Sequence, residues 1–154
     1  MKIKSILQSQ YLAALAMLKQ AIVKCPADVW DDPDDKDRFW FVAYHTLRYA
    51  HLYLKAQDKS FSRWDSRGHS RQGTPFSKEE ILNRLALVEQ DVAEQIPLMK
   101  LEGKSGYAWI PTNKLELQFD NIRHIQQHTG ELYERLSAHK VKLSWVALRY
   151  KEKK

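Results

Sequence analysis

The sequence has 154 residues, of which 44% are hydrophobic and 29% are charged, and this predicts one globular domain spanning residues 1–154. The formal net charge of +6 favours anionic partners, without selecting among nucleic acid, acidic membranes and anionic metabolites. A single cysteine, Cys25, excludes a disulfide framework within the chain and a cysteine-based zinc site.

The sequence shows no sign of a membrane segment. No stretch approaches the roughly 18 apolar residues that a bilayer-spanning helix needs. Lys2 and Lys4 precede an apolar run, but residues 8–10 interrupt it and no cleavage pattern follows, so we do not expect a signal peptide. We therefore expect a cytoplasmic protein without a membrane partner.

Apolar residues recur at helical spacing along most of the chain, and five glycines and five prolines are few, which indicates an all-α protein. The first helix should end before Pro26, because proline lacks the backbone donor that continues a helix. An acidic segment at residues 31–35 then favours the start of a second helix, expected over residues 36–57. The first apolar stripe consists of Ile3, Ile6, Leu7, Leu12, Leu15, Leu18 and Ile22.

Residues 59–76 lack periodicity and are expected to form a long connection. Ser77 and Glu80 have the spacing of a capping box, which predicts the start of a third helix that Pro97 ends or kinks. The apolar stripe of this helix consists of Ile81, Leu85, Val88, Val92 and Ile96.

A fourth helix is expected to begin near Asn113, with Glu116 three positions on. Its expected core stripe is Leu115, Phe119, Ile122, Ile125, Leu132 and Leu136. Four helices with a long connection between the second and the third predict a four-helix bundle with a crossover.

Two of the six histidines, His124 and His128, are four residues apart on the expected fourth helix. This spacing places them about 40° apart around the helix and about 6 Å apart along it, so both side chains can converge on one ion. Two imidazoles alone make a weak site, and His45, on the expected interior face of the second helix, is the best third ligand. The alternative for His45 is a hydrogen-bonded histidine of the core.

The other histidines are weaker candidates as metal ligands. His51 is six positions from His45 and should project to the other side of the same helix. His69 lies in the expected long connection and His139 beyond the expected end of the fourth helix, so both should be solvated.

Three segments carry a resemblance to a known family. Residues 121–132, NIRHIQQHTGEL, resemble the fourth-helix signature of the DinB-like superfamily. Residues 41–47, FVAYHTL, are similar to the segment that carries the family's second-helix histidine, and residues 109–117, WIPTNKLEL, to the segment leading into the fourth helix. The resemblance covers nearly the whole chain, and its fourth-helix motif is the most specific part.

The resemblance implies a four-helix bundle of the DinB type in which three histidines bind one divalent cation, with water in the open positions. His45, His124 and His128 each match one of those positions. Imidazole ligands suit zinc, nickel or iron. Such a metal lowers the pKa of a bound thiol or water molecule.

The family includes metal-dependent transferases of low-molecular-weight thiols such as bacillithiol, mycothiol or glutathione, so the resemblance implies such an enzyme, acting on a small-molecule substrate. A metal-dependent hydrolase and a non-enzymatic stress-response protein remain alternatives. Nucleic-acid binding ranks last, because the basic clusters at Arg63–Arg71 and after His139 are not joined to a recognisable reading motif.

Two further expectations concern the surroundings of the site and the assembly. Asp120 and Glu131 lie near the paired histidines and could orient their second nitrogens, or could be solvated helix charges. Five tryptophans and seven tyrosines exceed what one small core is expected to hold, so we predict a homodimer formed through exposed apolar helix faces. Family members also form dimers, which the resemblance extends to this chain.

Overall fold

A computed structural model describes residues 3–55, 64, 66–71 and 73–146. Within these ranges the regular structure is helical, and the only β interaction is an isolated bridge between Lys104 and Asn113, so the predicted all-α class is confirmed. None of the described helices is long and apolar enough to cross a membrane. The elements are α1 (Ile3–Lys24), α2 (Ala27–Trp30), α3 (Phe39–Leu54), the 3-10 helix η2 (Ser66–His69), α4 (Lys78–Leu98) and α5 (Lys114–Ala138).

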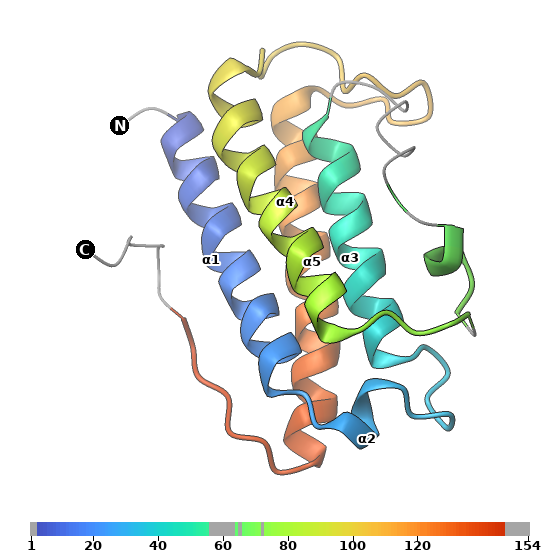
Figure 1. The fold of residues 1–154 in the computed structure, drawn as a ribbon. Helices are drawn as coiled ribbons and strands as arrows, with labels where there is room; N and C mark the ends of the chain where they lie inside the picture. Colours follow the sequence, from blue (N-terminus) through green and yellow to red (C-terminus); the bar gives the residue numbers. More distant parts are fainter. Residues whose placement is uncertain (1–2, 56–63, 65, 72, 147–154) are drawn as a thin grey trace.

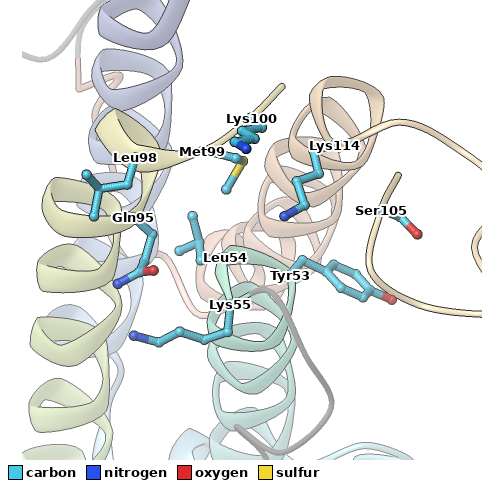
Figure 2. A pocket seen from close by; sticks show the side chains of 9 residues that line it. All are labelled: Tyr53, Leu54, Lys55, Gln95, Leu98, Met99, Lys100, Ser105 and Lys114. Carbon is cyan, nitrogen blue, oxygen red and sulfur yellow. The ribbon is translucent and has the colours of Figure 1, made fainter. Parts of the chain in front are cut away.

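The four long helices lie side by side (Figure 1), and α1 and α3 each pack against both α4 and α5. α3 and α4 run in the same direction (Figure 1). Their last residues, Leu54 and Leu98, therefore lie at the same end of the bundle, where both line one cavity (Figure 2). At the other end, Trp30 packs on Phe39 and its indole nitrogen donates to the carbonyl oxygen of Phe76. α5 runs opposite to α3 (Figure 1), so the middles of these two neighbouring helices meet.

Local signals set the starts of α4 and α5. The predicted capping boxes are present at Ser77 with Glu80 and at Asn113 with Glu116, where each side chain satisfies a free backbone donor of the other residue. α4 continues through Pro97 and ends one residue later.

The second long helix differs from its prediction, because it begins at Phe39 rather than at residue 36 and ends at Leu54 rather than at residue 57. The Asp31 carboxylate binds both Arg38 and the indole of Trp40, which holds the preceding residues in a turn. The short helix α2 before this turn was not predicted.

The buried face of α5 is more polar than the apolar pattern predicted. Phe119, expected in the core, is 46% exposed, whereas Gln118 and Asn121 are fully buried. The Tyr11 hydroxyl donates to Gln118 Oε1 at 2.7 Å, and Asn121 Nδ2 donates to the carbonyl oxygen of Ala50 at 3.1 Å. Both polar groups of the Gln118 amide are hydrogen-bonded, and the Asn121 amide donates although its Oδ1 atom has no partner among the described residues. Hydrogen bonding lowers the cost of burying polar side chains, so the pattern of apolar residues alone misplaces the interior face.

The face of α3 that points away from α5 anchors the segment before α4. Tyr44 stacks on Phe76 with ring centroids 4.7 Å apart. Gly68 lies against the same tyrosine so closely that a Cβ atom there would fall 2.0 Å from the ring. A side chain at position 68 would therefore displace this segment from α3.

The chain after α5 runs back along α1. The Gln20 side chain exchanges hydrogen bonds with the backbone of Ser144, and Lys24 Nζ donates to the carbonyl oxygen of Lys142. Val141 and Leu143 in this segment pack against the core, whereas Trp145 is 69% exposed. The remainder of the tail, residues 147–154, lies outside the described residues.

Candidate metal centre

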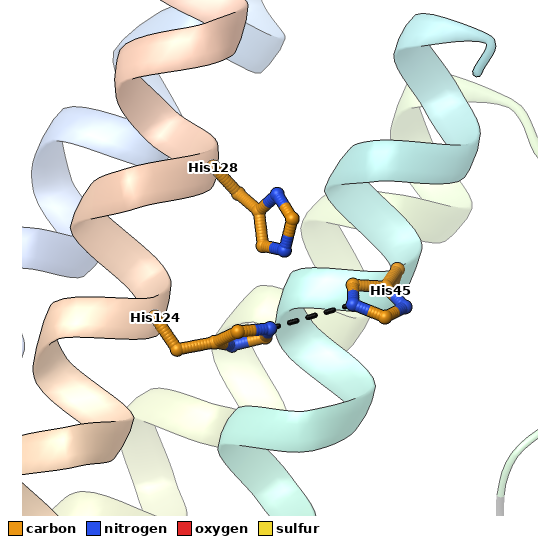
Figure 3. A group of neighbouring side chains, drawn as sticks. All are labelled: His45, His124 and His128. Carbon is orange, nitrogen blue, oxygen red and sulfur yellow. Dashed lines mark hydrogen bonds between the residues drawn. The ribbon is translucent and has the colours of Figure 1, made fainter. Parts of the chain in front are cut away.

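Three histidines from two helices converge where α3 and α5 meet (Figure 3). His45 comes from the middle of α3, and His124 and His128 come from successive turns of α5. Each offers one ring nitrogen, and these three atoms lie within 4.8 Å of one another. Within the described ranges this is the only group of three or more potential metal-binding side chains with such geometry. The cluster could hold a metal ion.

The spacing of the ligand atoms suits a small divalent cation. The Nε2 atoms of His45 and His124 are 3.4 Å apart. Two nitrogens that each lie 2.0–2.1 Å from a tetrahedrally coordinated zinc ion are also about 3.4 Å apart. The ring centroid of His128 lies 5.0 Å from that of His45 and 4.6 Å from that of His124. The donor set therefore fits a metal ion held by imidazole nitrogens.

Glu131 fixes the orientation of His128. Its Oε2 atom lies 2.8 Å from His128 Nδ1, one turn further along α5, which leaves Nε2 of His128 as the nitrogen facing the other two rings (Figure 3). Burial raises the pKa of Glu131, but the hydrogen bond and the charge of His128 outweigh burial and lower it. A carboxylate on the second nitrogen of a metal-binding histidine sets its tautomer and increases its basicity.

Asp120 binds an arginine and not a histidine of the cluster. Its carboxylate binds Arg123 at 2.7 Å, and Nδ1 of His124 is buried without a hydrogen-bond partner among the described residues. Neither ring nitrogen of His124 has a carboxylate as hydrogen-bond partner among the described residues, and its Nε2 atom faces Nε2 of His45.

The electrostatics keep two of the ligands neutral. Burial, reinforced by the neighbouring histidines, lowers the pKa of His45 from 6.5 to about 4. Burial and the charge of His128 likewise lower the pKa of His124 to about 4. Neutral imidazole is the form that binds a metal, so His45 and His124 are ready to coordinate at neutral pH without losing a proton.

Aromatic rings form one wall of the cluster. The Tyr49 ring lies 4.7 Å from the His45 ring and 5.6 Å from that of His124, and the Phe41 ring lies 6.1 Å from His45. The positive charges of Arg48 and Arg71 also act on His45 and contribute to its lowered pKa. The cluster therefore has a partly apolar wall with positive charge beside it.

The remaining histidines lie outside this cluster, as expected. His69 and His139 are exposed. His51 projects to the other face of α3 and is only 1% exposed. There its Nδ1 atom lies 2.5 Å from Asp91 Oδ2 on α4, and Lys55 pairs with the other oxygen of Asp91.

We call His51, Lys55 and Asp91 the α3–α4 polar cluster. Sequence reasoning did not identify it, although two features of the sequence point to it. His51 and Lys55 are four residues apart on one helix face, and Asp91 lies beside Val92 in the otherwise apolar stripe of α4. A carboxylate in an apolar stripe requires a partner from the facing helix.

Comparison with known proteins adds no relative: no protein-family model, no curated protein and no solved structure matches this chain.

Proposed function

We propose that this protein is a DinB-like four-helix bundle with a crossover between α3 and α4, and that it binds one divalent cation through His45, His124 and His128. We further propose that it is a cytoplasmic, metal-dependent transferase that uses a low-molecular-weight thiol. The observation that carries the proposal is the convergence of three imidazoles, two of them held neutral by burial, from two neighbouring helices.

The chemistry of the donor set narrows the choice of metal. Three nitrogen ligands without a carboxylate favour zinc, nickel or iron over magnesium or calcium, which prefer oxygen. Three protein ligands leave at least one coordination position for another molecule. A bound cation supplies Lewis-acid chemistry at that position and lowers the pKa of a thiol or of water.

The surrounding residues would assist such chemistry in different ways. Glu131 holds the His128 ring in place. Tyr49 and Phe41 shield one side of the site from water, which strengthens electrostatic interactions inside it. Positive charge at Arg48 and Arg71 attracts an anionic thiol.

The metal is tested first, on protein purified without a histidine tag. Elemental analysis should find about one divalent ion per chain, and replacing both His124 and His128 by alanine should remove it. The matched control replaces the two exposed histidines, His69 and His139, by alanine and should retain the metal. Equal metal content in the two double variants would contradict the site.

Activity is then tested with several thiols and a set of electrophiles, with and without a chelator. Chelator-sensitive transfer of the thiol to the electrophile supports the proposed reaction. Chelator-sensitive turnover without any thiol would instead indicate a metal-dependent hydrolase. Stoichiometric metal with neither activity would favour a non-enzymatic stress-response protein.

We also propose a homodimer formed through exposed apolar side chains. Trp109 is 60% exposed and Phe119 is 46% exposed, at the loop before α5 and in its first turns. Light scattering at micromolar concentration should give twice the mass of one chain, and replacing Trp109 and Phe119 by serine should shift the mass towards the monomer. A monomer mass for the wild type would refute the dimer.

A further inference from the structure

A second feature lies where α3 and α4 end and α5 begins. A cavity of about 270 Å³, which we call the end cavity, opens there (Figure 2). Its lining includes the side chains of Lys55, Lys100 and Lys114 and contains no aspartate or glutamate. Lys114 lies ten residues before His124 on α5, which corresponds to about 15 Å at 1.5 Å per residue. The end cavity is therefore separate from the metal centre.

Two of these lysines carry charges that no described residue neutralises. Lys100 and Lys114 form no ion pair within the described part of the chain, and both line the cavity together with Leu54 and Met99 (Figure 2). Two ammonium groups that share a cavity repel each other, and this repulsion falls with a bound anion between them. The cavity therefore favours a negatively charged ligand.

The third lysine, Lys55, forms an ion pair with a buried carboxylate. Lys55 pairs with Asp91, whose side chain is 3% exposed and is itself bound to the buried His51. An ammonium group has three donors, and the pairing with one carboxylate oxygen leaves others to face the cavity. Asp91 thus neutralises the charge of Lys55, while the charges of Lys100 and Lys114 remain available to a ligand.

The rest of the lining suits a short apolar group. Leu54 and Met99 form a buried apolar part of the wall, at 2% and 9% exposure. The Gln95 side chain, also in the lining, has no hydrogen-bond partner among the described residues and can donate to an oxyanion. The volume equals that of about nine water molecules at about 30 Å³ each, which limits the ligand to a small molecule.

We propose that the end cavity binds a small organic anion, whose carboxylate or phosphate group contacts Lys100 and Lys114 and whose short apolar group lies on Met99. The ligand is an amphiphilic anion rather than an inorganic ion, because the cavity places its charges next to an apolar wall. This binding does not depend on the metal centre or on the proposed thiol chemistry.

The test is calorimetric titration of the metal-free full-length protein with hexanoate. Hexanoate should bind with a dissociation constant of about 1 mM, which is typical of a ligand of this size. Hexanol and inorganic phosphate should each bind at least tenfold more weakly, because hexanol lacks the negative charge and phosphate lacks the apolar group. Hexyl phosphate, titrated in parallel, shows which oxyanion the cavity prefers.

The Lys100→Gln/Lys114→Gln variant should bind hexanoate at least tenfold more weakly, because it loses both charged contacts. The matched control is Lys19→Gln/Lys36→Gln, which makes the same change in net charge at exposed positions away from the cavity and should bind like the wild type. An equal loss of hexanoate affinity in both variants would show that the effect comes from net charge alone, and it would overturn the proposed site. Unsaturable binding to the wild type, or hexanol binding as tight as hexanoate binding, would also overturn it.

Discussion

The two faces of α3 hold histidines in opposite circumstances. On the face towards α4, His51 is bound to a buried carboxylate, which Lys55 also contacts. On the face towards α5, His45 meets two further imidazoles and no carboxylate, and burial keeps its pKa near 4. The first arrangement contains its own counter-charge, whereas in the second the only carboxylate bound to the three rings among the described residues is Glu131, which contacts His128. The comparison indicates a structural role for the α3–α4 polar cluster and supports the proposed ligand-binding role of the three histidines.

Replacing one histidine on each face tests this contrast most directly. His45→Ala should abolish stoichiometric metal binding and leave the free energy of unfolding of the metal-free protein little changed, because it removes a partly exposed ligand. His51→Ala should retain the metal and destabilise the fold, because it leaves Asp91 with one partner fewer. Elemental analysis and urea unfolding of both variants measure the two effects. The opposite pattern would reverse the roles assigned to the two faces.

Removing the buried carboxylate should have the next largest effect. Asp91→Ala leaves Lys55 and His51 without their shared partner, and breaking such a buried pair costs about 3–5 kcal/mol. Urea unfolding of the metal-free protein measures this loss. Asp120→Ala is the control, since the Asp120 pair with Arg123 is exposed and is worth less than about 1 kcal/mol. A loss below about 1 kcal/mol for Asp91→Ala would show that the cluster is not structural.

A smaller effect is expected at the carboxylate beside the metal centre. Glu131→Ala should weaken metal affinity by about 10–100-fold, the usual effect of losing a partner that orients a metal-binding histidine. A competition titration with a chromophoric chelator gives the affinity. Glu134→Ala, an exposed glutamate of the same helix, should leave it unchanged. Equal affinities for the wild type and Glu131→Ala would show that Glu131 is a solvated charge without a role at the site.

A further prediction concerns the pH dependence of stability. His45 and His124 have a pKa of about 4 in the folded chain and about 6.5 when unfolded. Between these values the unfolded chain binds more protons, so acidification from about pH 6.5 to about pH 4 should lower the stability of the metal-free protein. Below about pH 4 this contribution levels off, because both states are then protonated.

The test compares urea unfolding midpoints of the metal-free wild type and of His45→Ala/His124→Ala across this pH range. The difference between the two proteins separates the contribution of the histidines to the pH dependence of stability from that of the carboxylates. The variant should be the less sensitive to pH. An identical slope for both proteins would contradict the lowered pKa values.

Local pattern predicted the four long helices and the paired histidines His124 and His128, whereas the choice of His45 as third ligand also drew on the family resemblance. The capping residues Ser77 and Asn113 mark the starts of α4 and α5, because a cap acts within one turn of backbone. The four-residue spacing of His124 and His128 placed both on one face, and apolar neighbours placed His45 inside.

The sequence by itself therefore determined the all-α class, the starts of α4 and α5 and the histidine pair His124 and His128, because these depend on helical period and on contacts within a few residues. Only the tertiary structure decided that His45 Nε2 lies 3.4 Å from His124 Nε2 and that Asp120 binds Arg123 while Glu131 binds His128. The same holds for Phe119, exposed because the polar residues Gln118 and Asn121 find partners on facing helices. The physical reason is that the free energy of a buried polar group depends on a partner distant in sequence, which a local pattern does not contain.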